Sequence, residues 1–446
     1  MSRFFLPILL SVLACCGLAQ SASSYQNRSG MRDNDFVTVS GTHFLDASGQ
    51  PILFHGINVV NKSKDQGYTG NISPADFAQI RSWGMNSVRL CIFWDGLEPQ
   101  PGHFDEAYLS RIATLVEYAK QQGLYVLLDM HQDLYSVKFS DGAPAWATLD
   151  EGKTYTETTE WSDAYYQSKG VQTALDHFWA NSPGPDGMGL QDHYAKAWQF
   201  VASRFKDEPD VIGYDLMNEP FPGQDARRME QAILTRLSEL LAKLPGESHP
   251  SPQQLSDMEG TAEGRKQITK WMGNMTLFTG MLEAGTPIMQ GFEKTRLTPM
   301  YSRVRKAIRQ VDARHILFLE PAMSANLGIR SALTPLVDDE GRRDRQQAYA
   351  PHVYDIVVDT AFLDLTSNDR IALIVRRHSQ FSVKTRMPML VGEWGAFYLN
   401  PAAAKVTWYI VRQFDKVGCG DMFWAYRKEL KDWPGLEALK RHATSN

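Results

Sequence analysis

Short apolar runs alternate with longer amphipathic stretches through most of this chain. Turn residues bound each run, and no two-residue hairpin link joins one run to the next. Eight such runs occur, at 54–60, 87–94, 125–131, 211–218, 316–321, 348–354, 389–394 and 422–426. Their β-branched and aromatic residues are typical of buried parallel strands. Eight strand–helix repeats predict an α/β fold, a (β/α)8 TIM barrel, in preference to an open doubly wound sheet.

Two stretches are longer than such a barrel requires. One covers 140–190, after the third predicted strand, and the other covers 221–299, after the fourth. The second indicates two or three helices and is rich in methionine, which is more typical of packed core than of a ligand-binding wall. Because the loops that follow barrel strands form the catalytic face, we expect both insertions to overhang the site.

The N-terminus has the pattern of an export signal. A short basic start at residues 1–3 precedes an almost unbroken apolar run to Leu18, and small residues follow. We therefore expect a signal peptide over 1–22, an N-terminal extension over 23–50 and the barrel over 51–446. This predicts a secreted or periplasmic protein. Residues 12–15 loosely resemble a lipobox, so a lipid-anchored form is the alternative.

Composition narrows the classes of function. Hydrophobic residues make up 43% of the 446 and charged residues 22%, which excludes a disordered, collagen-like or coiled-coil chain. The net charge of −5 argues against a nucleic-acid binder. The first predicted strand is followed by no nucleotide-binding glycine motif, and Cys91 and Cys419 lack the spacing of metal ligands. We expect no metal or organic cofactor, and the sequence leaves open whether these cysteines pair.

Two predicted strands end in a lone carboxylate. The fourth ends Asn218-Glu219-Pro220, and the seventh ends Gly392-Glu393-Trp394. A charge at the end of an apolar strand is costly unless it is paired or functional. Glycoside hydrolysis requires two carboxylates that face each other across one bond, and a barrel mouth can place them so. We therefore predict Glu219 and Glu393 as a catalytic pair rather than as two structural ion pairs.

These motifs resemble glycoside hydrolase family 5, whose members are retaining barrel glycosidases. The resemblance implies that Glu219 is the acid/base and Glu393 the nucleophile. It also implies substrate-site residues at the other strand ends: Arg89, His131, Asn218, His352, Tyr354 and Trp424. By the same resemblance, Asn218 holds the 2-hydroxyl of the sugar and Trp424 forms the sugar platform. Arg89 and Tyr354 would keep the nucleophile ionised and oriented.

A closer resemblance concerns the substrate. Segments 129–133, 142–148, 193–198 and 214–221 look like those of endoglycoceramidases, the family 5 members that cleave the β-bond between glycan and ceramide. The similarity runs from about residue 56 to 221 and resumes in patches from 351 to 426. In that group an aspartate and a lysine bind glycan hydroxyls, which implies Asp133 and Lys64 here, with Lys62 as the rival lysine.

The chain departs from typical endoglycoceramidases in two ways. Those proteins carry a C-terminal β-sandwich, which we do not expect here because the chain ends at Asn446, 22 residues after Trp424. The helical insertion is also unlike the simplest members. We expect any peripheral contact with a membrane surface to pass to the insertion.

From these observations we expect a secreted retaining β-glycosidase that hydrolyses the glycan–ceramide bond of glycosphingolipids. One alternative is a family 5 glycanase or β-glucosidase that acts on polysaccharide or on monoglycosylceramide. Another is a non-enzymatic barrel that binds carbohydrate or lipid. An apolar slot beside the cleavage point would favour ceramide, whereas a long groove lined with aromatic side chains would favour polysaccharide.

Overall fold

The computed structural model describes residues 35–158, 160–246 and 248–444. The expected signal peptide, 1–22, and the first part of the expected extension, 23–34, lie outside these residues. Within the described ranges, no helix is both long enough and apolar enough to cross a membrane. Cys91 and Cys419 are separate buried thiols, which answers the question that the sequence left open.

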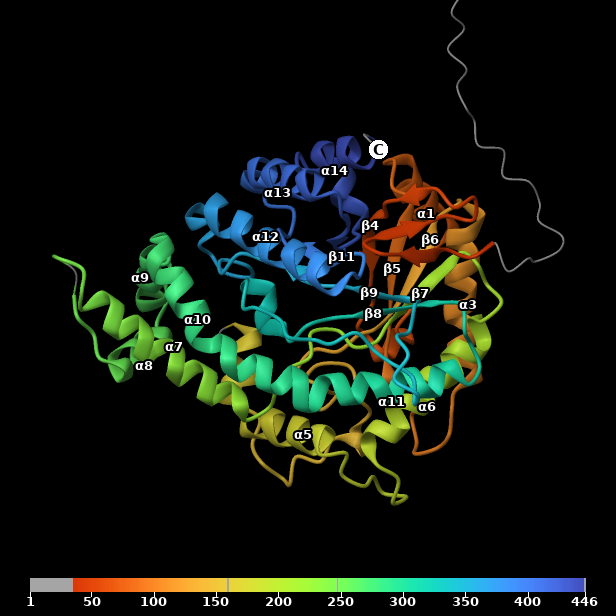
Figure 1. The fold of residues 1–446 in the computed structure, drawn as a ribbon, viewed down its shortest axis with the longest axis horizontal. Coiled ribbons are helices and arrows are strands. Elements are labelled where there is room, and N and C mark those ends of the chain that lie inside the picture. The colour runs from red at the N-terminus through yellow and green to blue at the C-terminus, as the bar shows by residue number, and fades with distance from the viewer. Residues whose placement is uncertain (1–34, 159, 247, 445–446) are drawn as a thin grey trace, which may run out of the picture. The chain divides into compact units, whose positions relative to one another are not determined.

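A parallel sheet of nine strands forms the centre of the fold (Figure 1). The strands are β4 (His55–Val59), β5 (Ser87–Ile92), β6 (Tyr125–Met130), β7 (Val211–Asp215), β8 (Ile316–Leu319), β9 (Gln347–Tyr349), β10 (His352–Val353), β11 (Leu390–Gly395) and β12 (Gly420–Trp424). Their order is β10-β11-β12-β4-β5-β6-β7-β8-β9. With helices around this sheet, the predicted (β/α)8 barrel is confirmed.

The sixth predicted strand is two strands in the structure. Ala350 and Pro351 separate β9 from β10, since proline has no N–H with which to continue a ladder. The Ala350 N–H donates to Leu319 O at 3.0 Å, and the Gly392 N–H donates to Pro351 O at 3.0 Å. The segment between β9 and β10 therefore bonds to both β8 and β11, which joins the two ends of the sheet.

The inside of the barrel is apolar near the N-terminal ends of the strands. The cluster there includes Phe54, Leu127, Phe318, Leu390 and Met422. A three-stranded antiparallel sheet, β1 (Thr38–Ser40), β2 (His43–Leu45) and β3 (Pro51–Ile52), packs on it through Phe44, whose ring stacks on Phe318 at 5.8 Å between centroids. Side chains alternate along a strand, so Asp129 shares the inner face of β6 with Leu127. Inside the barrel, a layer of charged side chains therefore follows the apolar layer toward the C-terminal ends of the strands.

The outer helices are α1 (Pro74–Ser82), α3 (Glu106–Gln121), α6 (Leu190–Phe205), α11 (Thr298–Arg309), α12 (Asn368–Thr385), α13 (Ala404–Val417) and α14 (Leu436–Thr444). The first insertion contains α4 (Ala164–Gln167) and α5 (Lys169–Trp179). The second contains α7 (Asp225–Leu241), α8 (Pro252–Glu259), α9 (Ala262–Trp271) and α10 (Met275–Phe292).

The second insertion has four helices among its described residues rather than the expected two or three. Local capping explains the extra break, because Thr261 and Asn274 accept hydrogen bonds from the backbone at the starts of α9 and α10. A π-helical turn, Glu293–Leu297, then continues α10 into α11. In Figure 1, α7, α8 and α9 lie at the left of the view, and α10 leads from them toward α11.

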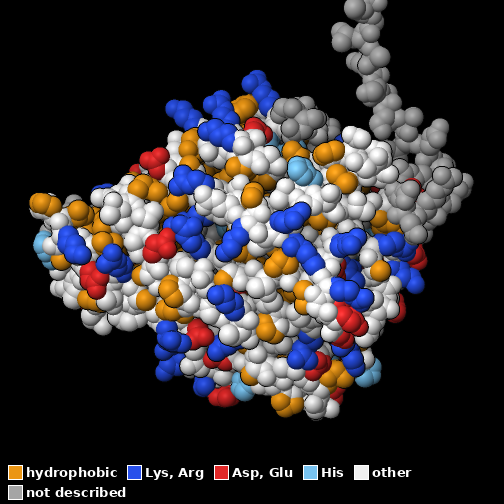
Figure 2. Space-filling view, viewed as in Figure 1, with side chains coloured by type: hydrophobic (Ala, Val, Ile, Leu, Met, Phe, Trp, Pro, Cys, Tyr) orange, Lys and Arg blue, Asp and Glu red, His pale blue; other side chains and the backbone are white. Residues whose placement is uncertain are grey.

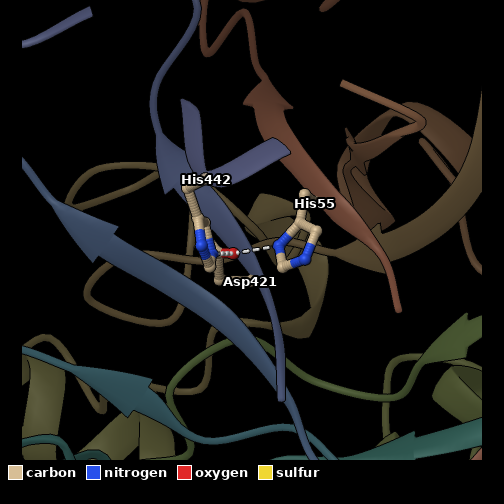
Figure 3. Close-up of side chains that lie close together, drawn as sticks. All are labelled: His55, Asp421 and His442. Carbon is tan, nitrogen blue, oxygen red and sulfur yellow. Dashed lines mark hydrogen bonds and ion pairs between the residues drawn. The ribbon is translucent and has the colours of Figure 1, made fainter. Parts of the chain in front are cut away.

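A buried ion-pair cluster holds the last helix against the barrel (Figure 3). His55 Nδ1 and His442 Nε2 lie 2.7 and 2.6 Å from the same oxygen of Asp421, and the Trp394 indole N–H donates to the other at 2.7 Å. Burial opposes the charge on His442, but Asp421 and Asp415 raise its pKa to about 9. Although burial acts against it, the two histidines hold the pKa of Asp421 far below its usual value. The contacts from both histidines and from Trp394 to the two oxygens of Asp421 therefore hold these four side chains together.

Candidate active site

Arg89 occupies the centre of the charged layer inside the barrel. Its side chain is fully buried, and its nitrogens lie 2.7–2.9 Å from one oxygen of each of four carboxylates. These carboxylates belong to Asp129, Asp215, Glu320 and Glu393, which lie on or just after β6, β7, β8 and β11. Burial and the charge of Glu320 raise the pKa of Asp215 well above its usual value. Four carboxylates around one guanidinium favour the protonated form of Asp215.

Glu393 lies on β11 with only 6% of its side chain exposed. Its Oε1 accepts a hydrogen bond from Arg89 Nη1 at 2.7 Å, and its Oε2 accepts one from the Tyr354 hydroxyl at 3.0 Å. His352 Nδ1 lies 3.6 Å from the same Oε2. Donors on both oxygens fix the direction of this carboxylate, as a nucleophile requires.

Glu219 follows β7 and faces Glu393 across the barrel mouth. Its Oε1 accepts hydrogen bonds from His352 Nδ1 at 2.8 Å and from Asn326 Nδ2 at 2.7 Å. Both donors contact Oε1, so the proton of the acid form belongs on Oε2. Burial raises the pKa of Glu219 to about 7, although the neighbouring His352 acts to lower it. A carboxyl group that holds its proton near neutral pH can act as a general acid.

The separation of the two glutamates indicates the kind of hydrolysis that they can perform. Their closest oxygens, together with a ring nitrogen of His352, lie within 4.8 Å of one another. Retaining glycosidases have carboxyl groups about 5–5.5 Å apart, whereas inverting enzymes leave about 6.5–9.5 Å for a water molecule. The arrangement therefore suits a nucleophile and an acid/base on opposite sides of one bond.

The structure brings all the predicted site residues except Lys64 to the same barrel mouth. The His131 ring stacks on the Trp424 ring at 5.3 Å between centroids, and its Nδ1 lies 2.8 Å from Asp129. Asn218 accepts a hydrogen bond from Arg89 Nη2 at 2.9 Å, which ties the catalytic turn to the charged layer. The cavity is lined by His131, Asp133, Asn218, Glu219, Tyr354, Glu393 and Trp424. Arg89 and His352 are buried beneath it.

Of the two lysines that the sequence offered, the structure places Lys62 at the cavity and Lys64 away from it. Lys64 Nζ lies 2.7 Å from Asp95, and 63% of its side chain is exposed. Lys62 lines the cavity, where it contacts Asp133 and lies 5.3 Å above the centroid of the Trp424 ring. Burial opposes its charge, but Asp133 raises the pKa of Lys62 well above its usual value. The two lysines share one loop, so only the path of that loop distinguishes them.

Two residues that contact the catalytic glutamate were missed from the sequence. Glu320 comes directly after β8 and accepts a hydrogen bond from the Glu219 backbone N–H at 2.8 Å. As a lone carboxylate at the end of an apolar run, it carried the same sequence signal as Glu219 and Glu393. Asn326 lies in a 3-10 helix, Met323–Leu327, where no periodic pattern marked it.

Glu219 and Glu393 are among the residues that line a cavity of about 640 Å³. The second insertion supplies much of the apolar wall: Met229, Ile233, Leu234, Ile268, Met272, Met281 and Leu282. The first insertion contributes Trp161 and Tyr166, so both insertions overhang the site as expected. Met289 and Met300 are buried in the core and do not line the cavity, whereas Met229, Met272 and Met281 line it, and the first two of these are also buried in the core.

A family model places the chain among known proteins. The model described as Cellulase (glycosyl hydrolase family 5) matches residues 45–243 and 257–429, which include both glutamates. The chain belongs to glycosyl hydrolase family 5. Within this family 5 hydrolase, the gap between the two matched ranges, 244–256, falls inside the second insertion.

Curated relatives and solved structures agree with the family. The chain is 34% identical over 189 residues to endoglycoceramidase I of Rhodococcus hoagii. The matched stretch covers 42% of this chain and 37% of that protein. It is 35% identical over 208 residues to an endoglycoceramidase of Cyanea nozakii, which covers 40% of each. The matches thus span about two fifths of these relatives. The structure of endoglycoceramidase II from Rhodococcus sp. in complex with ganglioside GM3 is similar with a TM-score of 0.66 and 25% identity, over 90% of this chain and 81% of that one.

Proposed function

We propose that this family 5 hydrolase is a retaining β-glycosidase that releases the glycan of glycosphingolipids from ceramide. The observation that carries the proposal is one cavity lined both by the catalytic pair and by a set of apolar side chains from the second insertion, which also contributes the charged residues Glu230, Glu259 and Arg265. A polysaccharidase needs sugar-binding groups on both sides of the cleaved bond, whereas most of the side chains that the second insertion contributes to the cavity are apolar. The relatives named endoglycoceramidase and the GM3 complex support this assignment.

The reaction takes place in two displacements. Glu393 attacks the anomeric carbon while Glu219 Oε2 donates its proton to the ceramide oxygen, so the C–O bond breaks and a glycosyl ester of Glu393 forms. The Glu219 carboxylate then accepts a proton from water, whose oxygen bonds to the anomeric carbon and displaces Glu393. Two inversions leave the released glycan in the β-configuration.

The position of Glu219 indicates where the lipid binds. Because this residue protonates the leaving oxygen, the ceramide must lie on its side of the cleaved bond. The second insertion follows Glu219 in the chain, and Asn326, which contacts its carboxyl group, belongs to the segment that supplies Met323 and Leu327. Lys62, Asp133 and Trp424 line the same cavity, and we expect sugar hydroxyl groups and a sugar face to bind to them.

The setting of this activity is also part of the proposal. An export signal over 1–22 would deliver the enzyme to the periplasm or the medium, where glycosphingolipids lie in membranes or micelles. Basic, acidic and apolar side chains are interspersed on the face drawn in Figure 2. Comparing the cell, periplasmic and medium fractions of an expressing culture tests the export.

Product analysis on two substrates tests the function. The protein is incubated with lactosylceramide in mild detergent and, separately, with a soluble cellulose oligosaccharide. We expect intact lactose and ceramide from the first, and loss of this activity in E219Q and E393Q. The exposed residue Glu239 of α7 provides the control E239Q, which should retain activity. Cleavage of the oligosaccharide alone would contradict the lipid assignment. Binding without turnover would favour the non-enzymatic barrel.

A further inference from the structure

We propose that Glu320 is a positioning residue that holds the acid/base Glu219 in place and sets its protonation through His352. This inference rests on the role proposed above for Glu219. The Glu320 carboxylate is 1% exposed and lies beneath the cavity rather than in it. It therefore acts on the substrate only through the groups that it contacts.

The first of these groups is the backbone of Glu219. Glu219 has φ +43°, a left-handed conformation that a residue with a side chain adopts only when its surroundings hold it there. Its N–H donates to Glu320 Oε2 at 2.8 Å. On the carbonyl side, Gln132 Nε2 donates to Asn218 O and Glu219 O at 2.8 and 3.1 Å. Glu320 thus supplies the acceptor that fixes the N-terminal side of the catalytic turn.

The second group is His352, which lies between Glu320 and Glu219. Its Nε2 is 3.2 Å from Glu320 Oε1, within ion-pair distance but without a hydrogen bond, and its Nδ1 is hydrogen-bonded to Glu219 Oε1 at 2.8 Å. Burial alone would lower the pKa of His352, but the charges of Glu320 and Glu393 raise it well above its usual value. These carboxylates favour the imidazolium form of His352, in which the Nδ1–H points at the oxygen of Glu219 that does not carry the acid proton.

The third group is Arg89, whose Nη2 lies 2.8 Å from the same Glu320 Oε1. Arg89 in turn binds Glu393, so one buried carboxylate connects to both catalytic glutamates. The other charged or titratable groups that face this set include Lys62, Asp129, Asp133, Tyr165, Tyr194, Asp215, Tyr301, Tyr354 and His378. Among the described residues, Glu320 is the one that contacts both His352 and the Glu219 backbone.

This arrangement changes in a defined way when the charge of Glu320 is removed. In E320Q the amide oxygen can still accept from the Glu219 N–H, but His352 loses the anion that favours its charged form. His352 then releases its proton at a lower pH, and Glu219 loses its cationic neighbour. The pKa of Glu219 rises, because a nearby cation favours the carboxylate. The carboxylate that Glu219 becomes after donating its proton is also less stabilised, so kcat falls.

The pH dependence of kcat/KM on a soluble aryl β-lactoside tests the proposal. In E320Q we expect the alkaline limb, which reports Glu219, to move to higher pH, and kcat to fall about tenfold to a hundredfold with little change in KM. Asp215 provides the matched control, since it is an equally buried carboxylate on Arg89 that does not contact His352 or Glu219. Because burial and the charge of Glu320 favour the protonated form of Asp215, the alkaline limb of D215N should stay where it is in the wild type.

Two further variants keep the test decisive if E320Q folds poorly. E320D keeps the negative charge on a side chain that is shorter by one methylene group. The alkaline limb of its kcat/KM profile should therefore stay near that of the wild type, while kcat falls. H352Q removes the cation directly, so its limb should move upward. A limb that stays in place or moves to lower pH in E320Q or H352Q would overturn the proposal.

Histidine NMR separates this proposal from the role of Glu219. In protein with 13C-labelled histidine, the His352 signal is identified by its loss in H352Q. We expect it to remain that of an imidazolium through neutral pH in the wild type and to titrate in E320Q. A signal that stays protonated in E320Q contradicts the link between Glu320 and His352. Full activity of E219Q would instead contradict the acid/base role.

Discussion

One methionine of the cavity wall offers a direct test of the lipid assignment. Met281 lies on α10, is partly buried and faces the cavity. The substitution M281Q keeps the length and flexibility of the side chain but places an amide where the structure has a thioether. Since glutamine and methionine have similar shapes, we expect the helix packing to survive.

The size of the expected loss in kcat/KM follows from the surface of Met281 that a bound lipid would cover. Full burial of a methionine side chain contributes about 1.5–3 kcal/mol, and because Met281 is already partly buried, a bound acyl chain recovers about 1 kcal/mol of that. An amide against hydrocarbon without a hydrogen-bond partner costs about 1–3 kcal/mol more. At the low end of each range the loss is about 2 kcal/mol, which is about thirtyfold in kcat/KM.

The assay compares two substrates of the same enzyme. kcat/KM is measured for lactosylceramide in mild detergent and for an aryl β-lactoside whose leaving group lacks acyl chains. M281Q should lose about thirtyfold on the first and stay within about twofold on the second. The control is M275Q, since Met275 lies on the same helix and is partly buried but does not line the cavity.

An equal loss on both substrates would show that the effect passes through the catalytic groups rather than through lipid contact. No loss on either would show that the acyl chains bind elsewhere. Either result would refute the inference that this wall receives ceramide.

Three further predictions follow from the same geometry. Because burial raises the pKa of Glu219 to about 7, kcat/KM on an aryl β-lactoside should decline as the pH rises through about 7; a profile flat to pH 9 would contradict its acid role. The pKa of His442 is raised to about 9, so the contribution of its charged form to stability is complete below about pH 6.5 and is lost as the pH rises through 9. The pKa of Asp421 is lowered, so its contribution to stability is present above about pH 4 and is lost as the pH falls further. The Tm of H442Q should accordingly lie below that of the wild type at pH 6 and approach it at pH 10, and a constant difference would refute this. Finally, K62A should raise KM for the glycan-bearing substrate about tenfold or more, while K64A leaves KM nearly unchanged. A rise in KM for K64A and not for K62A would show that Lys64 is the lysine that binds the glycan.

The barrel and its catalytic pair could be read from the chain because their signals are local. Alternating apolar runs and helical stretches report burial on both faces of a strand within a few residues. Glu219 and Glu393 each end such a run, and the barrel topology requires the C-terminal ends of its strands to meet at one mouth. The broken sixth strand shows the limit, since Pro351 lies inside an apolar run and only the sheet reveals that the ladder is divided there.

The sequence by itself determined the fold class, the two carboxylates and most of the polar groups around them. Only the tertiary structure decided that Lys62 rather than Lys64 reaches the cavity, that Asn326 contacts the acid/base, and that one carboxylate, Glu320, connects both catalytic glutamates. The physical reason is the distance along the chain over which each signal acts. Periodicity records whether a residue is buried, whereas hydrogen bonds between residues about a hundred positions apart depend on the path of loops and on which strands become neighbours.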